Sequence, residues 1–185
     1  MKHAFAISGM RGQGRQAWVG AAMACALVGA CPAHAGDVEL VTGQPLDFGT
    51  LLLFGTGTKT INPDGTTSAS GVATISGTRE GPAEFTLTYR PGNQTRNAIV
   101  QITLTQSVSA TVLGTTGRVS NLTTDLSGAG QISNGQSVIY TFRSCAPPSC
   151  SQTFRIGGKL SLTGSGTDAR FSFPVPVTAR LVAEF

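Results

Sequence analysis

The amino-acid sequence predicts an all-β protein, built as an antiparallel sandwich of two sheets with roughly nine or ten strands. Two observations predict this fold class. Apolar residues recur at every second position in many short runs, which is the period of a strand with one buried face. Clusters of Gly, Asn and Pro separate these runs, as turns do between antiparallel strands. No segment after residue 35 keeps helical spacing, and a barrel is the alternative to a sandwich.

Residues 1–35 have the features of a secretory signal peptide, so residues 36–185 are expected to form a single mature domain. The segment begins with basic residues, continues with an apolar run and ends in Ala33-His34-Ala35. This pattern predicts cleavage between Ala35 and Gly36, and the apolar run is shorter than the roughly 20 residues of a membrane span. A second interpretation stays open, because residues 28–31 resemble a bacterial lipobox that would place a lipid anchor on Cys31.

The composition of residues 36–185 excludes most catalytic and metal chemistry. Three of the 13 Lys and Arg residues lie in the leader, which leaves ten basic against nine acidic residues and gives no sign of a nucleic-acid partner. Both His residues also lie in the leader, so His provides neither a general base nor a zinc ligand. The carboxylates are spread along the chain without a spacing that nominates a pair. We therefore expect no enzyme activity, no catalytic residue, no cofactor and no metal.

Two cysteines remain after the leader, Cys145 and Cys150, and they enclose the sequence Ala-Pro-Pro-Ser. In an exported protein such a pair is expected to form a disulfide that closes a surface loop. A redox or metal-binding pair is the alternative, although the spacing is not Cys-x-x-Cys.

The first predicted strand follows the leader directly, since Val38, Leu40 and Thr42 alternate with their neighbours. The next candidate, residues 56–61, lies in the glycine-rich stretch FGTGTKT, which invites comparison with a phosphate-binding loop. The spacing of such a loop fails here, and the following Asn-Pro-Asp-Gly at 62–65 is a turn signal rather than the start of a helix. We therefore expect a strand that enters a hairpin.

Four further stripes of alternating apolar residues predict strands in the middle of the chain. They lie at residues 83–90, 100–104, 138–142 and 154–163.

The C-terminal run carries apolar residues at every odd position from 171 to 185, beginning with Phe171, Phe173, Val175 and Val177. At about 3.3 Å per residue it would span some 50 Å, so it is expected to bend or to pass between the sheets. Pro174 and Pro176 lack N–H groups on the same side, which predicts an edge or a bulge there.

The run Pro-Leu-Asp-Phe-Gly-Thr-Leu at 45–51 and the run Phe-Arg-Ile-Gly-Gly-Lys-Leu at 154–160 carry a family resemblance. Together with the turn at 62–65, they resemble the exported bacterial family known as domain of unknown function 4402. That family is similar to spore-coat-U-type secreted pilins and other fimbrial subunits. The resemblance implies an Ig-like or pilin-like sandwich. The segments 90–98 and 145–150 depart from the family pattern.

The resemblance also implies a role without catalysis. We expect an exported structural or adhesive subunit of the bacterial surface, in the periplasm, on the outer surface or secreted. Its partners would be further copies or related subunits, with a periplasmic chaperone and an usher. Such subunits assemble by strand donation, and residues 36–44 are the candidate arm, unless they form the first strand of a self-complete sandwich. The alternatives are a monomeric secreted or periplasmic carbohydrate-binding module and a surface lipoprotein anchored through Cys31.

Overall fold

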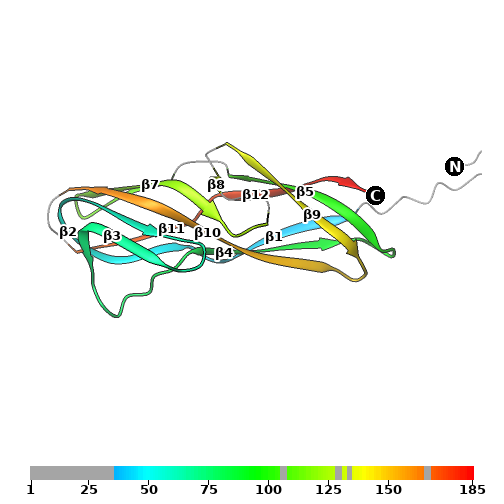
Figure 1. Ribbon diagram of the computed structural model, residues 1–185, viewed down its shortest axis with the longest axis horizontal. Helices are drawn as coiled ribbons and strands as arrows, with labels where there is room; N and C mark the ends of the chain where they lie inside the picture. The colour runs from blue at the N-terminus through cyan, green and yellow to red at the C-terminus, as the bar shows by residue number, and fades with distance from the viewer. Residues whose placement is uncertain (1–35, 105–107, 128–130, 133–134, 165–167) are drawn as a thin grey trace, which may run out of the picture. The chain divides into compact units, whose positions relative to one another are not determined.

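The computed structural model describes residues 36–104, 108–127, 131–132, 135–164 and 168–185, and within these residues it contains twelve strands and no helix (Figure 1). The strands are β1 (Asp37–Gln44), β2 (Leu46–Ile61), β3 (Thr67–Thr74), β4 (Ala83–Arg90), β5 (Arg96–Leu104), β6 (Ser109–Val112), β7 (Thr115–Thr124), β8 (Gln131–Ile132), β9 (Ser137–Cys145), β10 (Cys150–Thr163), β11 (Ala169–Phe173) and β12 (Val177–Glu184).

The strands form two antiparallel sheets that share one hydrophobic core. The first sheet has the order β1-β4-β10-β2-β11, with β3 added to β2, β7 to β10, and β6 and β8 to β7. The second sheet has the order β12-β5-β9. Phe85 and Phe154 of the first sheet belong to the same buried cluster as Val100 and Ile102 of the second. The predicted all-β sandwich is therefore confirmed.

The strand count differs from the expected nine or ten for a physical reason. Strands β6 and β8 have four and two residues, which is too short for a period of two to be visible in the sequence. The strand expected at 56–61 is the second half of β2, which has 16 residues and begins at Leu46. The first half of β2 pairs with β11 and the second half with β10.

Gly57 of the stretch FGTGTKT, together with Gly71, allows the close packing of β2 against β3. A Cβ on Gly57 would lie 2.4 Å from Cγ1 of Val72, and a Cβ on Gly71 would lie 2.4 Å from the carbonyl oxygen of Thr56. The pairing register shifts between Leu53 and Thr58, so the two backbones approach closely beside an irregular segment. Here glycine is required by a strand–strand contact.

The turn predicted from Asn-Pro-Asp-Gly joins β2 to β3. Gly65 donates its N–H to the carbonyl of Asn62 at 2.9 Å, and Asn62 donates to the carbonyl of Thr66 at 2.9 Å. The Asp64 carboxylate accepts hydrogen bonds from the Thr66 hydroxyl and N–H, which lower the pKa of Asp64. The hairpin predicted from local sequence is thus present.

The C-terminal run passes from one sheet to the other, as its length predicted. Strand β11 pairs with β2 in the first sheet, whereas β12 pairs with β5 in the second. Pro174 and Pro176 lie in the link between them, where no ladder N–H is needed. Both strands stand at the ends of their sheet orders, in agreement with the edge position that the prolines predicted.

Candidate functional site

Strand β1 is an edge strand held to the first sheet by β4. Its register runs from Asp37 opposite Arg90 to Gln44 opposite Glu84, and β4 is the strand to which it is paired within the described residues. Strand β12 of the second sheet lies near β1, but no ladder joins them (Figure 1). Strand β1 therefore stands where the two sheets meet.

The two faces of β1 differ in the way the sequence predicted. Val38 and Leu40 are half-buried and pack on the core. In the ladder they lie opposite the fully buried Tyr89 and Leu87 of β4. Thr42 continues this alternation but is exposed. The apolar contact of β1 with the core is therefore limited to two side chains.

Ion pairs support the outer face of β1. The guanidinium of Arg90 lies 2.6 Å from the carboxylate of Glu39 and 3.5 Å from that of Asp37. The hydrogen bond to Glu39 is the main reason that the pKa of Arg90 is raised. All three side chains are about half or more exposed, so water and salt screen these pairs and each contributes little.

A polar cluster lies where β1 begins. The hydroxyl of Tyr89 donates to Oε1 of Glu184 at 2.8 Å, and Nη1 of Arg96 donates to Oε2 of the same carboxylate at 3.2 Å. The three residues come from β4, β12 and β5. Burial, and then the hydrogen bond to Glu184, raise the pKa of Tyr89 to about 12.

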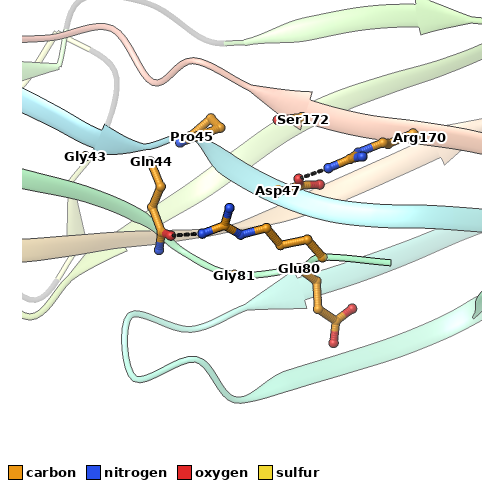
Figure 2. Close-up of a pocket in the computed structure, with 9 residues that line it drawn as sticks. Gly43, Gln44, Pro45, Asp47, Glu80, Gly81, Arg170 and Ser172 are labelled. Carbon is orange, nitrogen blue, oxygen red and sulfur yellow. Dashed lines mark hydrogen bonds and ion pairs between the residues drawn. The ribbon is translucent and has the colours of Figure 1, made fainter. Parts of the chain in front are cut away.

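A pocket lies at the other end of β1, where the chain turns through Pro45 into β2 (Figure 2). Its volume is about 250 Å³, and the segments 43–47, 79–81 and 170–172 contribute its walls. Arg170 binds the Asp47 carboxylate at 2.6 Å, and Asp47 also accepts the N–H of Gly49 at 2.9 Å.

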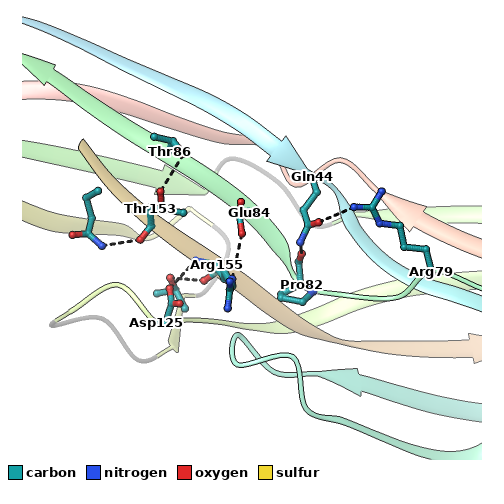
Figure 3. Close-up of polar contacts among 10 residues, drawn as sticks. Gln44, Arg79, Pro82, Glu84, Thr86, Asp125, Thr153 and Arg155 are labelled. Atoms are coloured by element: carbon teal, nitrogen blue, oxygen red, sulfur yellow. Dashed lines mark hydrogen bonds and ion pairs between the residues drawn. The ribbon is translucent and has the colours of Figure 1, made fainter. Parts of the chain in front are cut away.

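The side chain of Gln44 joins β1 to this pocket. Its amide donates to the carbonyl of Pro82 at 2.9 Å, and its oxygen accepts from Arg79 at 3.5 Å (Figure 3). Gln44 therefore fixes the end of β1 against the segment that leads into β4.

Lys59 is a buried charged residue that sequence reasoning missed, with 1% of its surface exposed. Its ammonium donates to the carbonyl of Phe48 at 3.0 Å and to the hydroxyl of Thr74 at 2.8 Å, and it pairs with the carboxylate of Glu80. The signal in the sequence was its place on the same strand face as Ile61. Its partner lies 21 residues away, which no local pattern reveals.

The polar faces of β4 and β10 are occupied by cross-strand contacts (Figure 3). The hydroxyls of Thr86 and Thr153 lie 3.3 Å apart, and Arg155 pairs with Glu84 at 3.3 Å. The N–H of Arg155 donates to the Asp125 carboxylate at 2.6 Å. These side chains stabilise strand pairing, so their presence on the surface is explained without a ligand.

The predicted disulfide is confirmed. Cys145, at the end of β9, is bonded to Cys150, at the start of β10, and the four residues between them are exposed.

The structure separates the residues proposed as donor or edge positions. Val38, Leu40 and Thr42 lie on β1, whereas Phe171, Phe173 and Val175 are fully buried and Val177 is half-buried at the start of β12. The C-terminal positions thus contribute to the core itself. Gly36 is described, while Ala35 and Cys31 lie outside the described residues.

The described residues contain no group of three or more His, Cys, Asp or Glu side chains placed to hold a metal ion. They also contain no helix of the length and hydropathy that would cross a membrane.

Comparison with known proteins identifies a family. No curated protein and no solved structure matched the chain. The model of the domain of unknown function DUF4402 matches residues 38–180, a range that begins within β1 and ends within β12. Since this range covers most of the sequence and nearly all of the sandwich, the chain belongs to the DUF4402 family.

Proposed function

We propose that this protein is an exported, non-catalytic structural or adhesive subunit of the bacterial surface, assembled by donation of strand β1. The observation that carries the proposal is the position of β1 at the edge of the first sheet, where one ladder, two half-buried apolar side chains and a few polar contacts hold it. In a polymer, β1 of one molecule would occupy the same position in the next.

The energetics permit such an exchange. Full burial of a Val or Leu side chain stabilises a protein by about 1.5–3 kcal/mol, and Val38 and Leu40 are only half-buried. Release of β1 in one molecule therefore costs a few kcal/mol of apolar burial together with its ladder. Binding in a neighbour restores the same contacts, because the β4 register that β1 meets is identical in every copy.

Other features support export and a fimbria-like role. The leader at 1–35 has the pattern of a signal peptide. The Cys145–Cys150 disulfide suits an oxidising compartment such as the periplasm. Residues 45–51 resemble the DUF4402 family, and the similarity of that family to spore-coat-U-type subunits supports partners of the same kind, namely further copies, a chaperone and an usher.

A cysteine cross-link tests strand donation directly. Glu39 and Thr88 face one another across the β1–β4 ladder, so Glu39→Cys with Thr88→Cys forms a disulfide wherever β1 docks. In assembled material we expect a ladder of covalent multimers on a non-reducing gel, because β1 docks in a neighbour. Cross-linked monomers alone, at every concentration and after long incubation, would contradict the proposal.

Matched substitutions on the two faces of β1 give a second test. Val38→Asp and Leu40→Asp should abolish multimers, because they place a carboxylate against the core. Val41→Asp is the control, since Val41 is 49% exposed and lies on the outer face. Equal multimer formation by all three variants would show that β1 is not the assembling element.

The pocket at the β1–β2 joint favours a second function, a monomeric carbohydrate-binding module. Gln44, Arg79 and Asp47 place amide, guanidinium and carboxylate groups around a volume of about 250 Å³. A glycan array with the leaderless chain, repeated with Arg79→Ala, would show a sugar signal that the substitution removes.

The mass of the exported protein would test the lipid anchor, because cleavage before Gly36 removes Cys31.

A further inference from the structure

Gly36 is the first residue of the mature chain if the protein is exported and cleaved as proposed above, and the site described here rests on that processing. Gly36 lies against the polar cluster of Tyr89, Arg96 and Glu184. A Cβ on Gly36 would lie 1.9 Å from Oε1 of Glu184, 2.6 Å from Cε2 of Tyr89 and 2.9 Å from the carbonyl oxygen of Arg90. No other residue type fits here without a shift of its neighbours.

The same contact sets an upper limit on the distance between the backbone nitrogen of Gly36 and the carboxylate of Glu184. Within one residue the nitrogen and the Cβ position are about 2.5 Å apart, so the nitrogen of Gly36 lies within about 4.4 Å of Oε1 of Glu184. In the precursor this nitrogen belongs to an uncharged peptide bond. Cleavage between Ala35 and Gly36 would turn it into an ammonium group with three donors, within reach of a carboxylate.

The carboxylate of Glu184 has the capacity to accept a further donor. A carboxylate has about four acceptor positions, and the described contacts of Glu184 use one on each oxygen, for Tyr89 and for Arg96. The side chain of Glu184 is only 14% exposed, so a pair formed with it is screened less than the outer pairs of β1.

The charges around this end of β1 favour an added cation. The carboxylates are those of Asp37, Glu39 and Glu184, and the guanidinium groups that pair with them are those of Arg90 and Arg96. Among these five side chains, one negative charge is therefore left over. An ammonium on Gly36 would balance it.

We propose that Glu184, supported by Tyr89 and Arg96, forms a binding site for the free N-terminal ammonium of β1. The ligand class is an extended peptide that begins with an unblocked glycine, whether it is β1 of the same chain or β1 of a second copy. Removal of the leader thus strengthens the docking of β1. The site at Glu184 binds a processed strand in preference to an unprocessed one.

A single preparation tests the site before and after cleavage. A short tag ending in a protease site is fused before Gly36, so that the cut leaves Gly36 as the first residue. We expect the cut to raise the Tm of the wild-type chain by about 2–5 °C, since 1 kcal/mol shifts the Tm of a domain of this size by about 2–4 °C. In Glu184→Gln the cut should leave the Tm unchanged.

Two controls separate this pair from other effects of removing a tag. A chain cut to begin at Ala35 keeps the ammonium charge but displaces it by one residue, so the cut should raise its Tm only slightly. Glu184→Asp keeps the carboxylate but shortens its reach, so its gain should be smaller than that of wild type; it also serves if Glu184→Gln does not fold. An equal gain in all chains, or no gain in wild type, would overturn the inference.

The outcome is independent of strand donation. The Tm is measured on monomers isolated by size exclusion, where β1 docks in its own chain. The Glu39–Thr88 cross-link reports multimers without involving Glu184. A failure of either experiment therefore identifies which of the two proposals is wrong.

Discussion

Lys59 is a charged side chain at the centre of an apolar strand face, and its burial has to be compensated by its contacts. The described contacts supply one acceptor for each of its three donors, from Phe48, Thr74 and Glu80. The first two lie on β2 and β3, and Glu80 lies in the segment before β4. Lys59 therefore joins the β2–β3 hairpin to the chain that leads into the next strand.

Substitutions of Lys59 and of Glu80 should lower the free energy of unfolding by different amounts. Lys59→Met leaves a carboxylate that is 33% exposed and can be solvated, so we expect a loss of about 1–2 kcal/mol. Glu80→Leu leaves a buried ammonium without a counter-charge, for which we expect about 3 kcal/mol or more. Urea denaturation measures both losses. A larger loss for Lys59→Met than for Glu80→Leu would show that Glu80 is not the main partner of Lys59.

The hydroxyl of Tyr89 predicts how stability depends on alkaline pH. Its pKa is raised from 10.0 to about 12 by burial and by the hydrogen bond to Glu184. A raised folded-state pKa gives a contribution that is complete below the unfolded-state value and is lost as the pH rises through the folded-state value. The free energy of unfolding should therefore fall between about pH 10 and pH 12.

Tyr89→Phe is the control for that prediction. It removes the titrating group, so this part of the pH dependence should disappear, at the cost of about 1 kcal/mol at neutral pH for the lost hydrogen bond. Denaturant midpoints of both chains at several alkaline pH values provide the measurement. A parallel decline in the two chains would assign the effect to other groups.

At the scale of the element, the Cys145–Cys150 bridge closes a short link between β9 of one sheet and β10 of the other. Chain-entropy arguments give about 2 kcal/mol for so small a loop. We expect Cys145→Ala with Cys150→Ala to lower the Tm by about 4–8 °C and to leave the fold intact. Differential scanning calorimetry measures the shift. An unchanged Tm would mean that the link is already restrained by other contacts.

Elements whose signals are local could be predicted from the sequence. The turn at 62–65, the disulfide and the first strand each depend on residues close together in the chain. The passage of the C-terminal run between sheets followed from its length and from Pro174 and Pro176. Strands β6 and β8 could not be found, because four and two residues do not establish a period.

The candidate site was predicted only in part, since its contacts join distant segments. Alternation marked Val38 and Leu40 on β1, and residues 33–36 marked the expected cleavage point. The bonds of Glu184 to Tyr89 and to Arg96 span 95 and 88 residues, and that of Arg170 to Asp47 spans 123. Sequence patterns describe faces of strands, whereas such contacts depend on which strands the fold brings together.

At the scale of the whole molecule, the first and last described strands meet at one place. Gly36 contacts Glu184, and the backbone of Phe185 exchanges two hydrogen bonds with Asn97 at the start of β5. A short linker could therefore join residue 185 to residue 36, with new ends opened in the turn at 62–65. Circular permutation of this kind is tolerated where ends lie close together at the surface. The rearranged chain should fold with the same far-ultraviolet spectrum. It should remain monomeric under the conditions in which the natural order is proposed to polymerise, because both ends of β1 would be tethered within its own chain and the strand could not be donated.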